Sequence, residues 1–196
     1  STRFSFLLLY AIILPLILEV EFILKLWLGT VGEYMVLFTQ LILIYCLVLA
    51  IGNPITIIMQ AAKKVKLYHG IVDSFVLLTL PLSYLFFKLG YPPESTLIVS
   101  ISMLVIAHAI RIWVFAKIVT FSLKEYCMQF VFPAVVVVIL SVISTMFIQS
   151  LFQNGLIQFV VVCLASFLCI GLCSYYIILT AKEKLFLFKV IKNKFK

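Results

Sequence analysis

The chain has 196 residues, of which 65% are hydrophobic and only 11% are charged. A soluble domain is about 45–50% apolar and about 25% charged, and a chain of this length leaves roughly a third of its surface in solvent when it folds. The composition therefore excludes a soluble domain or soluble enzyme and predicts an all-α, polytopic membrane helix bundle.

Six apolar segments are long enough to cross a bilayer, which takes about 20 helical residues. In chain order they are 4–28, 34–59, 71–89, 97–120, 128–149 and 156–180. The first is longer than a signal-peptide core and has no small-residue cleavage site, so we expect a true span. Because the chain starts at the edge of this span, we expect it to be part of a longer protein. The prediction is a six-helix transmembrane bundle over residues 1–180 and a basic cytoplasmic tail, 181–196.

The connections between these segments differ in charge on the two sides of the membrane. Gly- and Pro-rich turns at 29–32, 90–93 and 153–155 fall on one side, where Lys25 and Lys88 are the nearby cations. The opposite side carries Arg3, Lys63, Lys64, Lys66, Lys117, Lys124 and the lysines of the tail. By the positive-inside rule, both termini are predicted to be cytoplasmic. The net charge of +8 therefore marks topology and does not indicate a nucleic acid partner.

The sequence contains no recognisable catalytic or metal-binding motif. It lacks HExxH, GxSxG and GxxxxGK[ST], and it has no filter-like carbonyl loop of the kind a channel needs. The five cysteines show neither CxxC nor histidine spacing, which argues against a zinc site or a disulfide framework. We expect no enzymatic activity, no metal and no cofactor.

Three ionisable residues lie in the first predicted span. Charged groups near mid-bilayer cost about 2.5–3.5 kcal/mol even on insertion scales, so they normally face a bundle interior or a wet cavity. In a straight helix Glu19 would lie about 14 Å from the outer end at Leu28, close to mid-bilayer. Glu21 and Lys25 are spaced i, i+4 and can pair on one helix face. They are either lumen-lining groups or an interfacial pair that anchors the helix end.

The fourth predicted span carries His108 and Arg111, spaced i, i+3. Arg111 would lie about 13 Å from the cytoplasmic end at Thr120, too deep for easy snorkelling. Because arginine keeps its proton, it needs an acid, carbonyl groups or water, and Glu19 or Asp73 could be the acid. A buried structural ion pair of Glu19 with Arg111 is the alternative to a lumen-lining role. His108 is either a polar contact or a proton relay, and Asp73 could instead be an N-cap.

Prolines fall in four of the predicted spans, where each is expected to bend its helix. They are Pro15, Pro54, Pro81 and Pro133. The segment 51–54 is the best candidate for a hinge, because Gly52 and Asn53 interrupt an apolar helix there, and Asn53 is a candidate lumen-lining residue. Ordinary close helix packing at Gly52 is the alternative.

Several short motifs follow one another along the chain. They are Leu14-Pro15-Leu16, Phe22-Ile23-Leu24-Lys25-Leu26-Trp27-Leu28-Gly29, Asn53-Pro54, Ala61-Ala62-Lys63-Lys64-Val65-Lys66-Leu67-Tyr68, Pro81-Leu82-Ser83-Tyr84 and Tyr91-Pro92-Pro93. In this order they resemble the C-terminal half of polysaccharide (O-antigen type) flippases of the multidrug/oligosaccharidyl-lipid/polysaccharide exporter superfamily. The resemblance spans most of the chain.

The resemblance implies a two-lobed bundle, of which this chain would form the second lobe, around a cavity that opens alternately to each membrane face. It implies an undecaprenyl-pyrophosphate-linked oligosaccharide as substrate in a bacterial inner membrane, with H+ or Na+ as coupling ion and polysaccharide assembly proteins as partners. Because a pyrophosphate is anionic, buried cations in a wet lumen could bind it, with carboxylates pairing or exchanging protons. The candidate substrate or lumen-lining residues are Arg111, Glu19, Lys25, His108, Asp73 and Asn53.

Three alternatives stay open. A drug or metabolite exporter of the same superfamily would share the topology and differ in its cavity. A membrane-embedded glycan polymerase or transferase would need a large outer loop, and the longest loop here, near 91–96, is short. The chain could also be a structural half with no site of its own.

Overall fold

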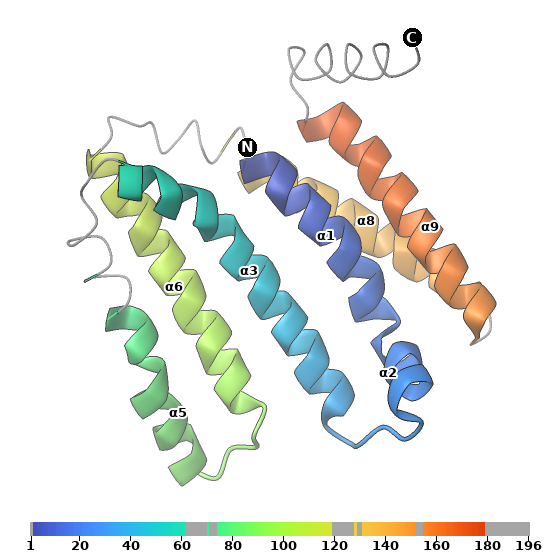
Figure 1. Cartoon of the computed structure of the whole chain (residues 1–196), viewed down its shortest axis with the longest axis horizontal. Helices are drawn as coiled ribbons and strands as arrows, with labels where there is room; N and C mark the ends of the chain where they lie inside the picture. The colour runs from blue at the N-terminus through green and yellow to red at the C-terminus, as the bar shows by residue number, and fades with distance from the viewer. Residues whose placement is uncertain are drawn as a thin grey trace. The chain divides into compact units, whose positions relative to one another are not determined.

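The computed structural model describes the helices and turns of two compact units, Ser1–Leu123 and Lys124–Lys196. The backbone is described for residues 2–61, 70, 74–118, 128, 131–151 and 155–178, and the side chains for 5–52, 70, 74–114, 128, 131–151 and 155–176. Within these ranges every regular element is a helix, so the predicted all-α class is confirmed. Figure 1 shows the helices of both units.

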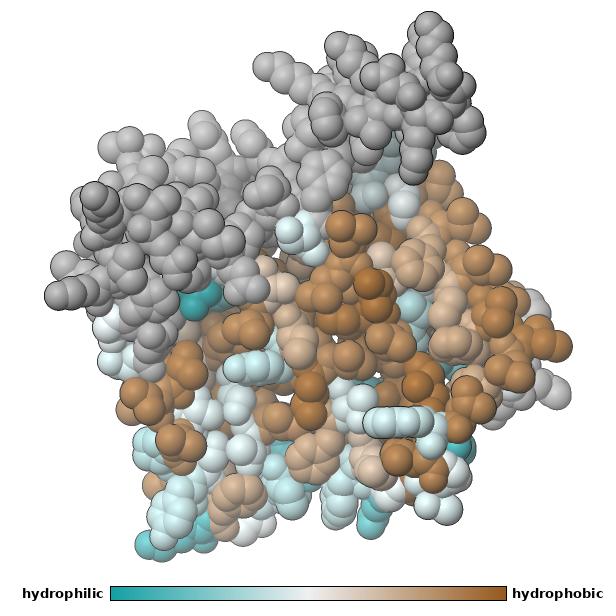
Figure 2. Space-filling model, in the orientation of Figure 1, coloured by the Kyte–Doolittle hydropathy of each residue, from teal (hydrophilic) through white to brown (hydrophobic). Residues whose placement is uncertain are grey.

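Several of these helices are suited to a lipid environment. Four are long and apolar enough to cross a membrane, and a bent helix pair makes a fifth. Between 6% and 28% of each of the four spans is buried, so side chains such as Ile143 and Phe147 are largely exposed. Figure 2 shows apolar residues over much of the visible face. Exposing such a surface to water is unfavourable, and the arrangement fits a multi-pass membrane protein.

One of the six predicted spans corresponds to a shorter helix in the described part of the chain. The four spans are Met35–Gly52, Ser95–Val114, Phe132–Ser150 and Leu156–Tyr176. Within the third predicted span, 71–89, the structure describes the shorter apolar helix Ser74–Lys88. At about 1.5 Å per residue this stretch is shorter than a hydrocarbon core of about 30 Å. Six spans and cytoplasmic termini therefore stay predictions.

The first unit is a row of helices around two parallel central ones. Its elements are α1 (Thr2–Leu18), α2 (Val20–Leu28), α3 (Met35–Ala61), α5 (Thr79–Lys88) and α6 (Ser95–Ile118). Helix α3 packs against α1, α2 and α6, and α6 also packs against α5. Because α3 and α6 run in the same direction (Figure 1), the turns that precede them lie at the same end of the unit. This agrees with the prediction that the turns at 29–32 and 90–93 share one side.

The turn between α5 and α6 shows why its glycine and aromatic residues are needed. Gly90 has a φ of 82°, a left-handed conformation that glycine adopts without a steric penalty. The Gly90 N–H donates to the Phe87 carbonyl, and the Tyr91 N–H donates to the Phe86 carbonyl, which together form a Schellman motif. The rings of Phe86 and Tyr91 pack with centroids 5.2 Å apart and supply the apolar contact that accompanies this motif.

The first predicted span is broken, which corrects the expectation of one helix over 4–28. Ser5–Leu18 and Val20–Leu28 meet at an angle of 73°. Pro15 already removes one hydrogen bond from α1. Two residues later the Ile17 carbonyl accepts a hydrogen bond from the Gln40 side chain of α3, 3.2 Å long. A side chain inserted into the i→i−4 ladder is a known cause of sharp helix bends.

Two other prolines do not interrupt their helices. Pro133 lies in the first turn of α8, a position that tolerates proline because the missing N–H would have no partner there. Helix α3 continues through Pro54 to Ala61 as one element. The body of α8 and the 51–54 segment of α3 are therefore uninterrupted helix.

The second unit is a close helix pair. It consists of α8 (Phe132–Ser150), α9 (Leu156–Cys173) and a π-helical turn, η2 (Ser174–Ile178). The buried residues of the pair are Ala134, Val137, Ser141 and Thr145 on α8 and Gln158, Val162, Ser166 and Ile170 on α9. These positions recur every three or four residues, so each set forms one stripe. Small residues in such a stripe let two membrane helices approach closely.

Candidate functional site

The residues Gly52, His108 and Arg111 form a tight contact between the two central helices of the first unit. Gly52 lies on α3, and His108 and Arg111 lie one turn apart on α6. A Cβ atom added to Gly52 would overlap both the Arg111 guanidinium and the His108 ring. The absence of a side chain at this position therefore creates the space that the two basic side chains occupy. Close packing at Gly52, the alternative to a hinge, is what the structure contains.

Arg111 is buried on a helix that is long and apolar enough to span a membrane. Its exposed fraction is 9%, and it lies in the Ser95–Val114 span. The guanidinium remains charged, so its burial must be compensated by polar groups, water or an anion. A buried cation in a span is expensive to maintain, which makes this residue the strongest functional candidate in the described part of the chain.

His108 is buried beside Arg111, with 7% of its surface exposed. Among the described residues, neither of its ring nitrogens has a hydrogen-bond partner. A buried imidazole without partners loses the hydrogen bonds that water would provide. A polar group that bound to this ring would therefore be stabilised. The structure thus places two of the predicted site residues together and gives one of them unused hydrogen-bonding capacity.

Glu19 lies at the break between α1 and α2 and not in the middle of a straight helix. Helix α1 has 17 residues, about 25 Å of helix, so it reaches across most of a hydrocarbon core before Glu19. The calculation that put Glu19 near mid-bilayer depended on the unbroken helix and does not hold. Glu19 is nevertheless buried, with 6% exposed, and it caps the start of α2 through its backbone.

The predicted Glu19–Arg111 pair is not favoured by the position of the two residues along α3. The carbonyl of Ile17, two residues before Glu19, is bound by Gln40 of α3, whereas Arg111 lies against Gly52 of the same helix. Gln40 and Gly52 are separated by about 18 Å along the axis of α3. An ion pair needs about 4 Å or less between its charged atoms.

Glu21 and Lys25 form the i, i+4 pair that the sequence predicts. The Lys25 Nζ atom lies 2.5 Å from Glu21 Oε1, and the two side chains are 58% and 63% exposed. The pair is on the outer surface of α2 and not in a helix–helix contact. Lys25 is therefore separate from the Arg111 site within this unit.

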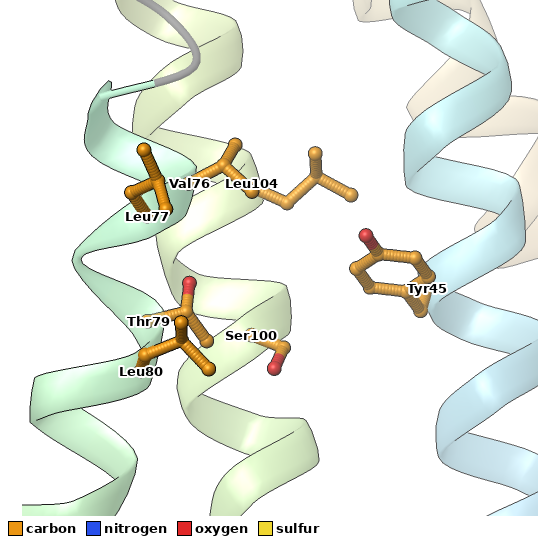
Figure 3. A pocket seen from close by; sticks show the side chains of 7 residues that line it. All are labelled: Tyr45, Val76, Leu77, Thr79, Leu80, Ser100 and Leu104. Atoms are coloured by element: carbon orange, nitrogen blue, oxygen red, sulfur yellow. The ribbon is translucent and has the colours of Figure 1, made fainter.

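A cavity of about 310 Å³ lies between α3, α5 and α6 (Figure 3). It is lined by Tyr45, Val76, Leu77, Thr79, Leu80, Ser100 and Leu104. Figure 3 shows Tyr45 on the α3 side facing residues of α5 and α6. No hydrogen bond of the Tyr45 or Thr79 hydroxyl to another described residue occurs, whereas Ser100 donates to the Thr96 carbonyl. The cavity thus combines an apolar wall with hydroxyl groups that can still accept a polar partner.

The cavity and the basic contact occupy the same helix faces. On α6, Leu104 is one turn before His108, and Arg111 is almost one turn further. On α3, Tyr45 precedes Gly52 by two turns. The cavity floor at Leu104 and the guanidinium-bearing Arg111 are therefore about 10 Å apart along one side of α6.

Two functional candidates were not found by sequence reasoning, and two predicted ones cannot be compared. The first two are Gln40 and Tyr45, which carry no formal charge and lie in a long apolar run of α3. The amide of Gln40 within an apolar span could have indicated a polar contact between helices. Nothing in the sequence distinguishes Tyr45 from other aromatic residues. The side chain of Asn53, and all of Asp73, lie outside the described residues.

Comparison of the chain with protein-family models, curated proteins and solved structures finds no match.

Proposed function

We propose that this chain is part of a membrane transporter that flips an undecaprenyl-pyrophosphate-linked oligosaccharide from the inner to the outer leaflet of a bacterial cytoplasmic membrane. The observation that carries the proposal is the burial of Arg111 against Gly52. A cavity with hydroxyl groups in its wall lies along the same faces of α3 and α6. The order of the flippase-like motifs supports the choice of substrate.

The chemistry of the two features suits an anionic glycolipid. A guanidinium binds phosphate oxygens through two parallel hydrogen bonds, and a neighbouring imidazole can add a further donor. The hydroxyls of Tyr45, Thr79 and Ser100 can exchange hydrogen bonds with sugar hydroxyls, while the apolar wall contacts the faces of the sugar rings. Arg111 would therefore bind the pyrophosphate, and the cavity would accommodate part of the glycan.

Transport requires that the site change its accessibility. Arg111 is almost fully enclosed by the α3–α6 contact, so substrate can reach it when the two helices separate at Gly52. Binding of the pyrophosphate would favour the separated state, because a ligand shifts an equilibrium toward the state that it binds more tightly. A gradient of H+ or Na+ would supply the energy for the return.

The test compares Arg111→Met with Arg111→Lys in the full-length protein, expressed in cells that lack the native gene. Met removes the charge at similar length, and Lys keeps the charge without the planar fork. We expect Arg111→Met to lower surface polysaccharide at least about tenfold, equivalent to about 1.4 kcal/mol, and Arg111→Lys to lower it less.

Trp113→Phe is the matched control, because Trp113 is on the same helix and 53% exposed. It should export normally. Normal export by Arg111→Met, at an unchanged amount of protein in the membrane, would contradict the proposal. A gene deletion that lowers drug resistance without accumulating lipid-linked glycan would favour a drug exporter.

A further inference from the structure

The short helix α2 has a surface that a transmembrane helix would not have. It turns away from α1 by 73°, packs against α3 and α1, and buries Val20 and Leu24. Leu26 and Trp27 are 69% and 80% exposed. Both are large apolar side chains that the described residues leave mostly uncovered.

The charged pair of α2 and its two most exposed apolar side chains, Leu26 and Trp27, are on different sides of the helix, while Leu28 at the helix end lies on the side of the charged pair. At about 100° per residue, Glu21 and Lys25 lie within about 40° of each other, and Ile23, Leu26 and Trp27 lie on the opposite half. Both side chains of the ion pair are more than half exposed. In a straight span, Glu21 would lie about 10 Å inward of Leu28, and the pair would face lipid, which is costly.

We propose that α2 is an interfacial helix that lies along the lipid headgroup surface. The Glu21–Lys25 pair faces water, Val20 and Leu24 dock on α3, and Ile23, Leu26 and Trp27 enter the boundary between headgroups and acyl chains. Tryptophan is favoured at this level because one edge of its ring is polar. The bend at Glu19 turns the helix out of the line of α1, at the end of the first unit where the turns before α3 and α6 also lie (Figure 1). The proposal does not depend on what the protein transports.

A scan of spin labels attached singly at residues 20–28 of the full-length protein, reconstituted in phospholipid vesicles, tests this arrangement. Depth is measured from the accessibility of each label to oxygen and to a water-soluble nickel reagent. An interfacial helix gives a depth that oscillates with a period of about 3.6 residues, shallow at 21 and 25 and deeper at 23, 26 and 27. The same scan over exposed positions of α9 serves as the control and should show a steady change in depth.

Two results would overturn the proposal. A steady change of about 12 Å from residue 20 to residue 28 would show a transmembrane segment. Labels that are all in water would show a helix that does not touch lipid.

A second measurement avoids labels altogether. This chain has two tryptophans, so Trp113→Phe, combined with replacement of any tryptophan outside these 196 residues by phenylalanine, leaves Trp27 as the single reporter. We expect Trp27 fluorescence to be quenched most by lipids brominated near the headgroup end of the acyl chain. Strongest quenching by bromines near the chain end, or no quenching by any of them, would contradict the interfacial position.

Discussion

Gly52 of α3 and Arg111 of α6 lie so close that no side chain beyond a hydrogen atom fits between them. His108 shares this contact, and all three residues belong to helices that run side by side within the first unit. The contact buries a charged side chain in a predicted membrane span, which is energetically costly. We therefore expect this charge to have a function.

Substitution of Gly52 by alanine should therefore disturb the basic contact. The added methyl group overlaps Arg111 and His108, and overpacking of this kind costs about 1–3 kcal/mol. We expect a lower melting temperature of the detergent-solubilised protein and reduced export. Gly171→Ala is the matched control, since its Cβ would meet nothing within 4 Å, and it should be neutral. Equal melting temperatures for Gly52→Ala and the wild type would contradict the close contact.

Replacement of Gln40 by leucine should loosen the break between α1 and α2. The substitution removes the hydrogen bond from Gln40 to the Ile17 carbonyl and should lower the free energy of unfolding by about 0.5–1.5 kcal/mol. Thr39→Val is a suitable control, because the Thr39 hydroxyl donates to the Met35 carbonyl of its own helix. Thermal unfolding of the two variants decides the matter: a Gln40→Leu protein as stable as the control would refute the role of Gln40.

The stripe of small residues between α8 and α9 should tolerate loss of a hydroxyl but not added volume. The Ser166 hydroxyl donates to the Val162 carbonyl of its own helix, so Ser166→Ala should change stability by no more than about 0.5 kcal/mol. Ser166 is fully buried, so Ser166→Leu should cost about 1–3 kcal/mol or more. Ser150→Leu, at an exposed position of α8, should be tolerated. A stable Ser166→Leu protein would argue against this helix contact.

The register of α8 against α9 can be checked by cross-linking. The Ser144 Oγ and Cys169 Sγ atoms are 3.0 Å apart. A thiol placed at residue 144 should form a disulfide with Cys169 under mild oxidation, since its sulfur would replace an oxygen that already lies next to Cys169 Sγ. Alkylation of free thiols followed by mass spectrometry of the peptides measures the bond. Ser150→Cys should form no bond with Cys169, and failure of Ser144→Cys to cross-link would show a different register.

The class of the fold could be predicted because composition and hydropathy are properties of whole segments. Long apolar runs such as 34–59 and 97–120 predict α3 and α6. Such runs must be helical because unpaired backbone groups are costly in lipid. The break at Glu19 could not be predicted, because it involves a hydrogen bond from Gln40, a residue of a different helix. Pro15 indicated a bend in the right part of the chain but not its angle.

The candidate site could be predicted in part. The spacing of His108 and Arg111 places both on one face of a helix, and both side chains are buried in the structure. Their contact with Gly52 depends on the alignment of α3 with α6, which no local pattern encodes. The same limit explains why Tyr45 was missed: its role comes from the cavity that three helices form together.

The central claim is that residue 111 faces a passage that water can enter during the transport cycle. In a variant without native cysteines, Arg111→Cys and Val105→Cys are each treated in membranes with a charged, water-soluble thiol reagent. Val105 is 49% exposed on the surface of α6 and would face lipid. The account predicts that the thiol at residue 111 reacts and the thiol at residue 105 does not. If residue 111 were as unreactive as residue 105, Arg111 would belong to a dry structural contact, and the transport role assigned to it would be wrong.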